Sequence, residues 1–401
     1  MELHQRNETA TASATGLPQA DPWRARLEVV RLFLGLGATA FGGPAAHIAL
    51  MESETVRKRR WVTSEEFLDL LGATHLIPGP NSTEMAMHLG YRRAGMWGLW
   101  LGGAAFILPA ALLVMALAAI YRQWGQLPTL RELLYGVQAV MIAVVLQAAW
   151  SLGRTALKQT WLVVIGILAF VLRLYGVHEL VLLLAAGGLG LAIHRLPTLH
   201  NLAGLAFPVL SLLEPLRLIG AGVSGLPQTV RLFLIFFKIG SVLYGSGYVL
   251  LAFLQADFVD RLHWITPGQL LDSVVVGQAT PGPVLTTATF LGFLVAGPSG
   301  ALAGTVGIFL PAFILVSLTC RWLPRLRQTP RFGPFVDGVN AASLGLLATV
   351  VLQLGRAAIV DVGSGLIALV SLWLLLRTKV NSIWLMLGGG GIGWFLVHWW
   401  Y

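Results

Sequence analysis

The sequence predicts an all-α polytopic membrane protein built from two homologous halves in inverted orientation. Each half is expected to hold about five crossings and one hairpin broken at Pro-Gly-Pro. Composition, an internal repeat and a charge reversal between matching loops carry this prediction. The chain has 401 residues, of which 56% are hydrophobic and only 11% are charged, against roughly 25% charged residues in soluble proteins. Runs such as Met96–Ile120 and Gly297–Cys320 reach the roughly 20 apolar residues that cross a bilayer.

Composition and motifs exclude several classes of function. The net charge of +9 comes from Lys and Arg in short loops between apolar runs, where membrane proteins carry them, so no nucleic-acid partner is expected. Cys320 is the single cysteine, which excludes an internal disulfide and a cysteine metal cluster. The sequence has no Walker motif, dinucleotide motif or paired histidines at haem-ligand spacing. We therefore expect no metal, no cofactor, no enzymatic activity and no ATP-driven pumping.

An internal repeat is the most informative feature of the chain. At an offset of 202 to 203 residues, Pro78-Gly79-Pro80 matches Pro281-Gly282-Pro283, and "GVQA" at 136–139 matches "GVNA" at 338–341. Four nearby glycines match as well: Gly90, Gly95, Gly98 and Gly102 fall on Gly292, Gly297, Gly300 and Gly304. The repeat predicts a polar tail over 1–26, halves over 27–195 and 231–401, and a linker over 196–230.

The first half is expected to cross the membrane five times. The expected crossings are Leu27–Met51, Met96–Tyr121, Leu133–Leu152, Trp161–Leu174 and Leu180–Ile193. Two further segments, Phe67–Ile77 and Asn81–Leu89, are each too short to cross, so they are interpreted as a hairpin broken at Pro78–Pro80. An odd number of crossings per half requires the second half to be inserted upside down.

Charge in matching loops tests this inversion. Residues 57–60 read Arg-Lys-Arg-Arg, whereas the matching loop carries Asp257, Asp260 and a single arginine, Arg261. Farther along, the order reverses, because two arginines in the first half correspond to four arginines over 321–331. Equivalent loops that exchange their basic character are expected to face opposite sides of the membrane. Inverted repeats of this kind are typical of secondary transporters, which bind substrate near the midplane on discontinuous helices.

Each Pro-Gly-Pro break predicts a helix start inside the membrane. Residues Asn81 to Thr83 are N-cap residues followed by the acidic Glu84, and Thr286 and Thr287 follow the second break. A helix start offers amide N–H groups and the positive end of a dipole, so two such starts can converge on one small anion. The candidate substrate-binding residues are Gly42, Gly43, Pro78, Gly79, Pro80, Asn81, Ser82, Thr83, Lys238, Gly245, Ser246, Gly247, Gln278, Pro281, Gly282, Pro283, Thr286 and Thr287.

Several of these candidates have a plainer structural interpretation. The Gly-rich triplets at 42–44 and 245–247 can bring backbone amides close to a ligand, or they can simply allow tight helix packing. Lys238 lies deep in an apolar run, which by default marks function, with snorkelling to the interface as the alternative. His47 and Glu84, with His75 and His88 behind them, are candidates for proton coupling or for satisfied structural groups. The repeat-paired Gln138 and Asn340 are expected to hydrogen-bond helices across the core.

Two stretches resemble the long, two-domain type of the chromate ion transporter family. They are "FGGPAAHIALMESETVRKRRWVTSEEFLDLLGATHLIPGPNSTEM" from residue 41 and "FKIGSVLYGSGYVLLAFLQADFV" from residue 237, the latter followed by "GQATPGPV". The resemblance implies a bacterial inner-membrane protein that exports chromate and confers chromate resistance, and it suggests a link to sulfate, an isosteric dianion. Export of a dianion from a cell that is negative inside is favoured by about 2.3 kcal/mol per charge per 100 mV.

Other functions stay open on the residues alone. The nearest alternative is a carrier for sulfate or another oxyanion, which would use the same donors. An anion channel is a second alternative, because broken helices also line pores, and a membrane-bound reductase is a third. The lipid bilayer is the expected environment, and a homodimer is compatible with the sequence.

Overall fold

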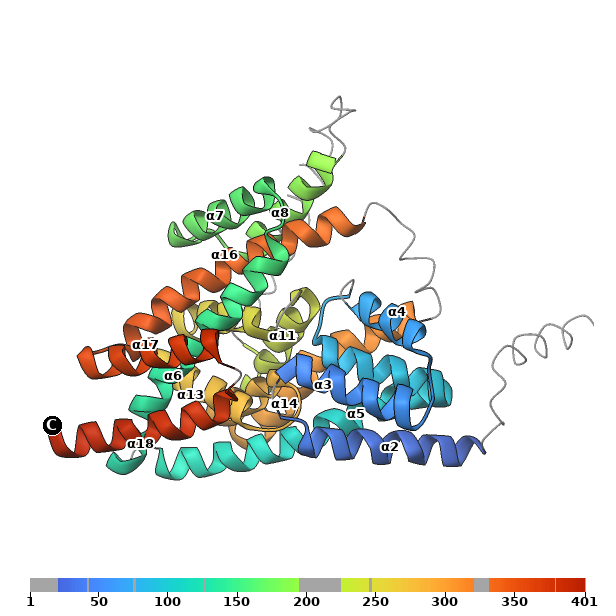
Figure 1. Cartoon of the computed structure of the whole chain (residues 1–401), viewed down its shortest axis with the longest axis horizontal. Coiled ribbons are helices and arrows are strands. Elements are labelled where there is room, and N and C mark those ends of the chain that lie inside the picture. The colour runs from blue at the N-terminus through green and yellow to red at the C-terminus, as the bar shows by residue number, and fades with distance from the viewer. Residues whose placement is uncertain are drawn as a thin grey trace, which may run out of the picture.

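The computed structural model describes residues 21–41, 43–74, 77–125, 127–194, 225–244, 247–320, 332–378 and 380–400. Within these ranges all regular structure is helical (Figure 1). The first half contains α2 (Pro22–Thr39), α3 (Gly43–Glu52), the π-helix η1 (Ser53–Lys58), α4 (Ser64–Thr74), α5 (Asn81–Trp124), α6 (Pro128–Ala156), α7 (Thr160–Leu174) and α8 (Glu179–His194). The second half contains α11 (Gln228–Val242), η3 (Gly247–Val249), α12 (Leu250–Leu254), the π-helix η4 (Gln255–Arg261), α13 (Pro267–Ala279), η5 (Val284–Thr286), α14 (Thr287–Thr319), α16 (Phe332–Ala358), α17 (Val362–Arg377) and α18 (Ser382–Trp400).

Among the described residues, four helical stretches are long and apolar enough to cross a membrane. They are Asn81–Trp124, Pro128–Arg154, Val284–Thr319 and Gly333–Ala358. Shorter apolar helices accompany them, among them α7 and α17. The helical membrane class predicted from composition is confirmed.

The stretch named α5 is two antiparallel helices. Non-helical dihedrals at Ala94 (φ −139°, ψ 23°) and Gly95 (φ 63°, ψ −153°) interrupt it. A Cβ atom added to Gly102 would lie 3.0 Å from the carbonyl oxygen of Ala86, although a straight helix would separate these residues by about 24 Å at 1.5 Å per residue. The chain therefore folds back at Ala94–Gly95, between the segments expected at Asn81–Leu89 and Met96–Tyr121.

The second half repeats this fold-back with nearly the same geometry. Ala296 has φ −138° and ψ 23°, and Gly297 has φ 64° and ψ −152°. Added Cβ atoms show why glycine is needed beside each turn: that of Gly90 would lie 2.2 Å from the Gly98 oxygen, and that of Gly292 would lie 2.1 Å from the Gly300 oxygen. The sequence repeat is therefore also a repeat of backbone conformation.

Two helices differ in extent from the expected segments. Helix α2 begins at Pro22, within the segment expected as a tail over 1–26, and Asp21 caps it by accepting a hydrogen bond from the Trp23 amide at 3.1 Å. The span expected over Leu27–Met51 is divided, since α2 ends at Thr39 and α3 begins at Gly43, whose φ is +76°. The expected linker lies mostly outside the described residues.

The two halves are interleaved. The fold-back helices α5 and α14 pack against each other, and so do α6 and α16. The last helices are exchanged: α7 and α8 pack on α16 of the second half, and α17 and α18 pack on α6 of the first (Figure 1). Both exchanged pairs of helices approach closely at glycines. An added Cβ on Gly136 of α6 would lie 1.8 Å from the Gly389 oxygen of α18, and one on Gly338 of α16 would lie 2.2 Å from the Ala186 oxygen of α8.

Candidate functional site

The two Pro-Gly-Pro breaks are joined reciprocally to the interrupted first helices of the opposite halves. The Gly79 amide donates to the Leu243 carbonyl at 2.8 Å, just after α11. The Gly282 amide donates to the Ala40 carbonyl at 3.0 Å, just after α2. Ala40 and Leu243 are repeat equivalents, as are Gly79 and Gly282. The four chain interruptions thus form two matching pairs across the halves.

Only glycine fits at the centre of each break. Gly79 has φ +147° and Gly282 has φ +91°, which L side chains rarely adopt. An added Cβ on Gly79 would lie 3.0 Å from the Ala312 Cβ, and one on Gly282 would lie 2.6 Å from the Ala110 Cβ. Because each break touches the opposite fold-back helix as well, it is held tightly on two sides.

Helix starts follow both breaks, in slightly different forms. Pro80 precedes α5, and its carbonyl accepts from the amides of Thr83 at 2.8 Å and Glu84 at 3.0 Å. After Pro283 the chain makes the short 3₁₀ turn η5 before α14 begins at Thr287. The helix start predicted at Asn81 is confirmed, and the second one comes one turn later than its break.

The threonine hydroxyls of the second break are engaged locally. Thr286 Oγ1 donates to the Pro283 carbonyl at 2.9 Å, and Thr287 Oγ1 donates to the Val284 carbonyl at 2.8 Å. Such local side-chain bonds compete with other partners. The hydroxyls would have to rotate before either could donate to an anion.

Buried polar atoms without partners gather at the first break. Glu84 is fully buried, neither carboxylate oxygen has a hydrogen bond, and an added Cβ on Gly79 would lie 2.2 Å from its Oε1. Thr83 Oγ1 and His88 Nε2 are also buried without partners, as is Gln278 Nε2 ahead of the second break. Unsatisfied buried groups cost free energy and are rare in native proteins, so this cluster is suited to a ligand or a proton.

His47 lies at the second break. Its Nε2 is 3.1 Å from the Ala40 carbonyl, the same oxygen that accepts the Gly282 amide, and its Nδ1 is buried without a partner. The two preferred candidates for proton coupling are therefore divided between the breaks, Glu84 at the first and His47 at the second.

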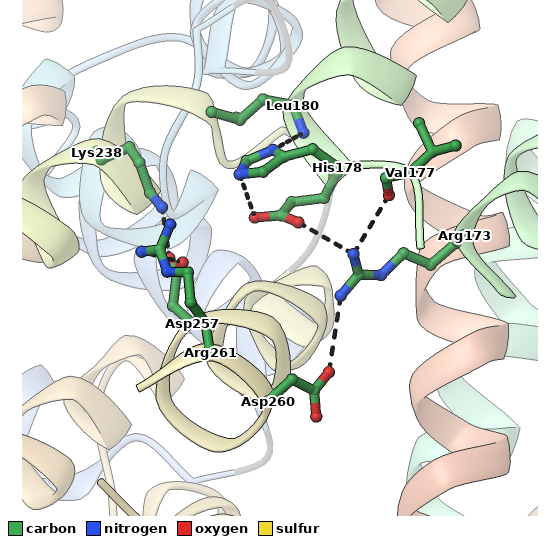
Figure 2. A network of polar contacts seen from close by, with 9 residues as sticks. Arg173, Val177, His178, Leu180, Lys238, Asp257, Asp260 and Arg261 are labelled. Atoms are coloured by element: carbon green, nitrogen blue, oxygen red, sulfur yellow. Dashed lines mark hydrogen bonds and ion pairs between the residues drawn. The ribbon is translucent and has the colours of Figure 1, made fainter. Parts of the chain in front are cut away.

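Lys238 forms a buried ion pair that the sequence analysis did not anticipate. Its Nζ lies 2.5 Å from Asp257 Oδ2, and Arg261 Nη2 lies 2.7 Å from the other oxygen of the same carboxylate (Figure 2). Asp257 is 1% exposed and Lys238 is 13% exposed. The lysine charge is balanced within the protein, so the side chain does not need to snorkel.

A second polar group in Figure 2 joins the α7–α8 loop to η4. Arg173 lies 3.4 Å from Glu179 Oε2 and 3.8 Å from Asp260 Oδ2. His178 stands 3.6 Å from the other oxygen of Glu179. Burial lowers the pKa of His178, which favours the neutral ring at pH 7.

Other predicted residues are placed less completely. Gly42, Gly245, Ser246 and His75 lie outside the described residues. Gly247 opens η3, where an added Cβ would lie 3.4 Å from Leu285 in η5, so it stands beside the second break. In the part of the chain that the structure describes, no group of three or more His, Cys, Asp or Glu side chains is arranged to hold a metal ion.

Sequence reasoning missed one central acidic residue. Asp272 in α13 is 5% exposed and accepts from Tyr121 Oη at 2.6 Å and from Gln138 Nε2 at 2.7 Å. The predicted role of Gln138 in bonding helices across the core is thereby confirmed. Asp272 could have been found as a carboxylate in an apolar segment with a repeat equivalent, Asp69.

The fold and the paired breaks define a multi-pass helical membrane protein made from two copies of one unit. The chain belongs to the chromate transporter family, whose family model matches residues 27–191 and again 230–394. It is 33% identical over 405 residues to the chromate transport protein of Pseudomonas aeruginosa, with 96% of this chain and 95% of that protein covered. It is 31% identical over 387 residues to the chromate transport protein of Cupriavidus metallidurans, with 95% of both chains covered.

A third relative extends the comparison beyond these two. The probable chromate transport protein of Synechococcus elongatus is 32% identical over 356 residues, with 87% of this chain and 90% of that protein covered. No solved structure matches the chain. The resemblance seen in the sequence is confirmed, and the protein is a transporter and not an enzyme.

Proposed function

We propose that this protein is a secondary transporter that exports chromate across the bacterial inner membrane and thereby confers chromate resistance. The membrane potential, an ion gradient or both would drive it. Three relatives named as chromate transport proteins or probable ones support the substrate. The reciprocal bonds of Gly79 and Gly282 carry the proposal for the site, because they join two helix starts to interrupted helices of the opposite halves. Repeat transporters typically bind substrate on discontinuous helices at the interface between their repeats.

The proposed binding site uses backbone donors of the helix starts with neutral side chains. The amides of Gly79 and Gly282 already donate to carbonyls, so the first amides after each break, at the starts of α5 and η5, would bind the anion. Neutral donors suit a carrier, because the anion must also leave. The proposed binding residues remain those of both breaks and of the glycine triplets, with Asn81, Ser82, Thr83, Gln278, Thr286 and Thr287 supplying side chains.

An inverted arrangement of the halves is part of the proposal. Reciprocal contacts between equivalent residues are typical of a two-fold relation. Positive φ angles also recur at equivalent residues of the two halves, such as Arg60 at φ 53° and His263 at φ 51°. With five crossings per half and the exchange of basic loops, the two-fold axis would lie in the membrane plane. A homodimer remains an untested prediction.

Lys238 is proposed to attract the anion even though Asp257 balances its charge. Lys238→Gln should raise the apparent KM for chromate by about tenfold, equivalent to roughly 1.4 kcal/mol of binding free energy. The double variant with Asp257→Asn removes the stranded carboxylate and separates attraction from folding. If the double variant regains a normal KM, Lys238 has only a structural role. Initial rates over a range of chromate concentrations, normalised to protein in the membrane, make the comparison.

Labelled-chromate uptake into inside-out vesicles tests the proposed function. We expect accumulation that grows with a lumen-positive potential or a pH gradient, collapses with ionophores and is absent from vesicles without the protein. Accumulation insensitive to both gradients would contradict gradient-driven export. Sulfate competition and counterflow discriminate the alternatives: counterflow identifies a carrier rather than a channel, and transport of sulfate without chromate would favour the sulfate carrier.

A further inference from the structure

A row of ionisable side chains lies along one face of the first of the two helices in α5. Glu84, His88 and Arg92 are spaced four residues apart within residues 81–93, which are helical up to the fold-back. Side chains four residues apart in a helix are neighbours, with about 5–6 Å between their Cβ atoms. The row therefore extends from the first Pro-Gly-Pro break to the fold-back.

Burial decreases along this row. Glu84 is 0% exposed and neither of its carboxylate oxygens has a hydrogen bond, and His88 is 1% exposed with no hydrogen bond at Nε2. Arg92 is exposed, and its Nη2 lies 3.3 Å from Glu66 Oε1 of α4. Chains of Asp, Glu and His side chains inside membrane proteins form proton relays. The row has the form of such a relay, with buried groups at the break and an exposed ion pair at the other end.

Two further side chains act electrostatically on the buried groups. Tyr244, which follows α11 of the opposite half, lies close enough to Glu84 to interact with it, and Arg92 acts in the same way on His88. Helix α14, which packs against α5, has no ionisable side chain over Thr287–Thr319. Other ionisable residues lie on α5 and on the described elements packed against it, but none of them hydrogen-bonds to the Glu84 carboxylate or to His88 Nε2. They are Tyr91, Arg93, Tyr121 and Arg122 of α5, Arg24, Arg26, Glu28 and Arg31 of α2, His47 and Glu52 of α3, Glu65, Glu66 and Asp69 of α4, and Asp272 of α13.

The second half has no counterpart of this row. The equivalent stretch after the second break, residues 287–295, reads Thr-Ala-Thr-Phe-Leu-Gly-Phe-Leu-Val and contains no ionisable side chain. Helix packing does not require Glu84 and His88, because the equivalent helix leads to the same fold-back geometry without them. A row in one half only gives a proton path that opens on one side of the membrane, where the first half folds back.

We propose that His88 is a relay residue that carries protons between Glu84 at the first break and water beside the Arg92–Glu66 ion pair. The inference rests on the proposed transport function and names the path by which a coupled proton reaches or leaves that site. Protonated Glu84 transfers its proton to His88 Nε2, which leaves a carboxylate and an imidazolium. The imidazolium then releases a proton to water beside Glu66 and becomes neutral again. The positive charge of Arg92 favours this release.

Proton exchange at Glu84 tests the relay without any transported anion. In infrared spectra of the purified, lipid-reconstituted protein at mildly acidic pH, the carboxyl C=O band of Glu84 is identified by its loss in Glu84→Gln. After a rapid change from H₂O to D₂O, the shift of this band measures how fast the buried proton exchanges. We expect His88→Leu and His88→Gln to slow the exchange about tenfold or more. Met87→Leu, which changes the neighbouring residue of 0% exposure, is the matched control and should exchange as the parent does.

A merely structural role of His88 predicts the opposite sign. Loosened packing would speed exchange both at Glu84 and at backbone amides, which the amide bands of the same spectra record. Glu66→Gln should slow the exchange of Glu84 about threefold, whereas Glu65→Gln, at an exposed neighbouring position, should not.

Three outcomes would overturn the relay. They are exchange at the parental rate or faster in both His88 variants, an unchanged rate in Glu66→Gln, and the absence of any carboxyl band that Glu84→Gln removes. Because no chromate is present, failed chromate transport together with exchange that depends on His88 would overturn the substrate and not the relay.

Discussion

Replacing Gly79 with alanine should abolish transport and destabilise the protein, and Gly282→Ala should do the same. The positive φ angles at these positions cost a non-glycine residue on the order of 1–3 kcal/mol. The new methyl group would also overlap Glu84 Oε1 at 2.2 Å in Gly79→Ala, or the Ala110 Cβ at 2.6 Å in Gly282→Ala. If the break moves to relieve the overlap, its backbone hydrogen bond is disturbed, from Gly79 to Leu243 or from Gly282 to Ala40.

Chromate export, normalised to the amount of protein in the membrane, and the unfolding temperature in detergent measure this effect. Gly35→Ala is the matched control, because Gly35 lies within α2 and an added Cβ meets nothing within 4 Å; it should behave as wild type. Wild-type export by either variant would show that the break it alters does not belong to the transport site.

Replacing Glu84 with glutamine should remove any contribution of the pH gradient to transport. A buried carboxylate without hydrogen bonds is costly when ionised, so Glu84 is proposed to take up and release a proton as it meets the anion or water. Glutamine has nearly the same shape but cannot titrate. Transport driven by a pH gradient should fall about tenfold or more, while transport driven by the membrane potential should persist and the protein should remain stable.

Vesicle uptake under each gradient separately measures this outcome. Glu84→Asp keeps a carboxyl group and should restore part of the response to pH. The exposed Glu65 offers a matched control, because Glu65→Gln removes an acidic group at the start of α4 and should leave both driving forces effective. A full response to the pH gradient in Glu84→Gln would exclude this residue from coupling.

The sequence predicted the helical class, the repeat and the chain interruptions because glycine and proline act through their own backbone. The helix start after Pro80 follows from a local rule of this kind, whereas the fold-back at Gly95 was not predicted, because the hairpin was expected at Pro78–Pro80. It did not predict the partners of the breaks, since Ala40 and Leu243 contribute only carbonyl oxygens and any residue carries one. Contacts that depend on tertiary packing were also missed.

Lys238 and the threonines illustrate that second limitation. The lysine was expected to attract an anion, but it forms an ion pair with Asp257, 19 residues farther along the chain. An interruption after α11 and the π-helix η4 separate the two residues, so regular helical spacing could not predict the pair. Thr286 and Thr287 were expected to offer hydroxyl hydrogens, which instead bond to the backbone of η5. The sequence located these groups near the chain interruptions but did not reveal which atoms they contact.

The exchange of the last helices between the halves has a consequence for biogenesis. A ribosome makes α7 and α8 well before α16, the helix on which they pack, so during synthesis these two helices must stay in the lipid without their final partner. Gly187 and Gly190 on α8 pack against Phe335 and Pro334 of α16. These contacts cannot form until α16 has been synthesised. Folding of the first half is therefore finished by the second, and a polypeptide with a single copy of the unit would need another copy to complete it.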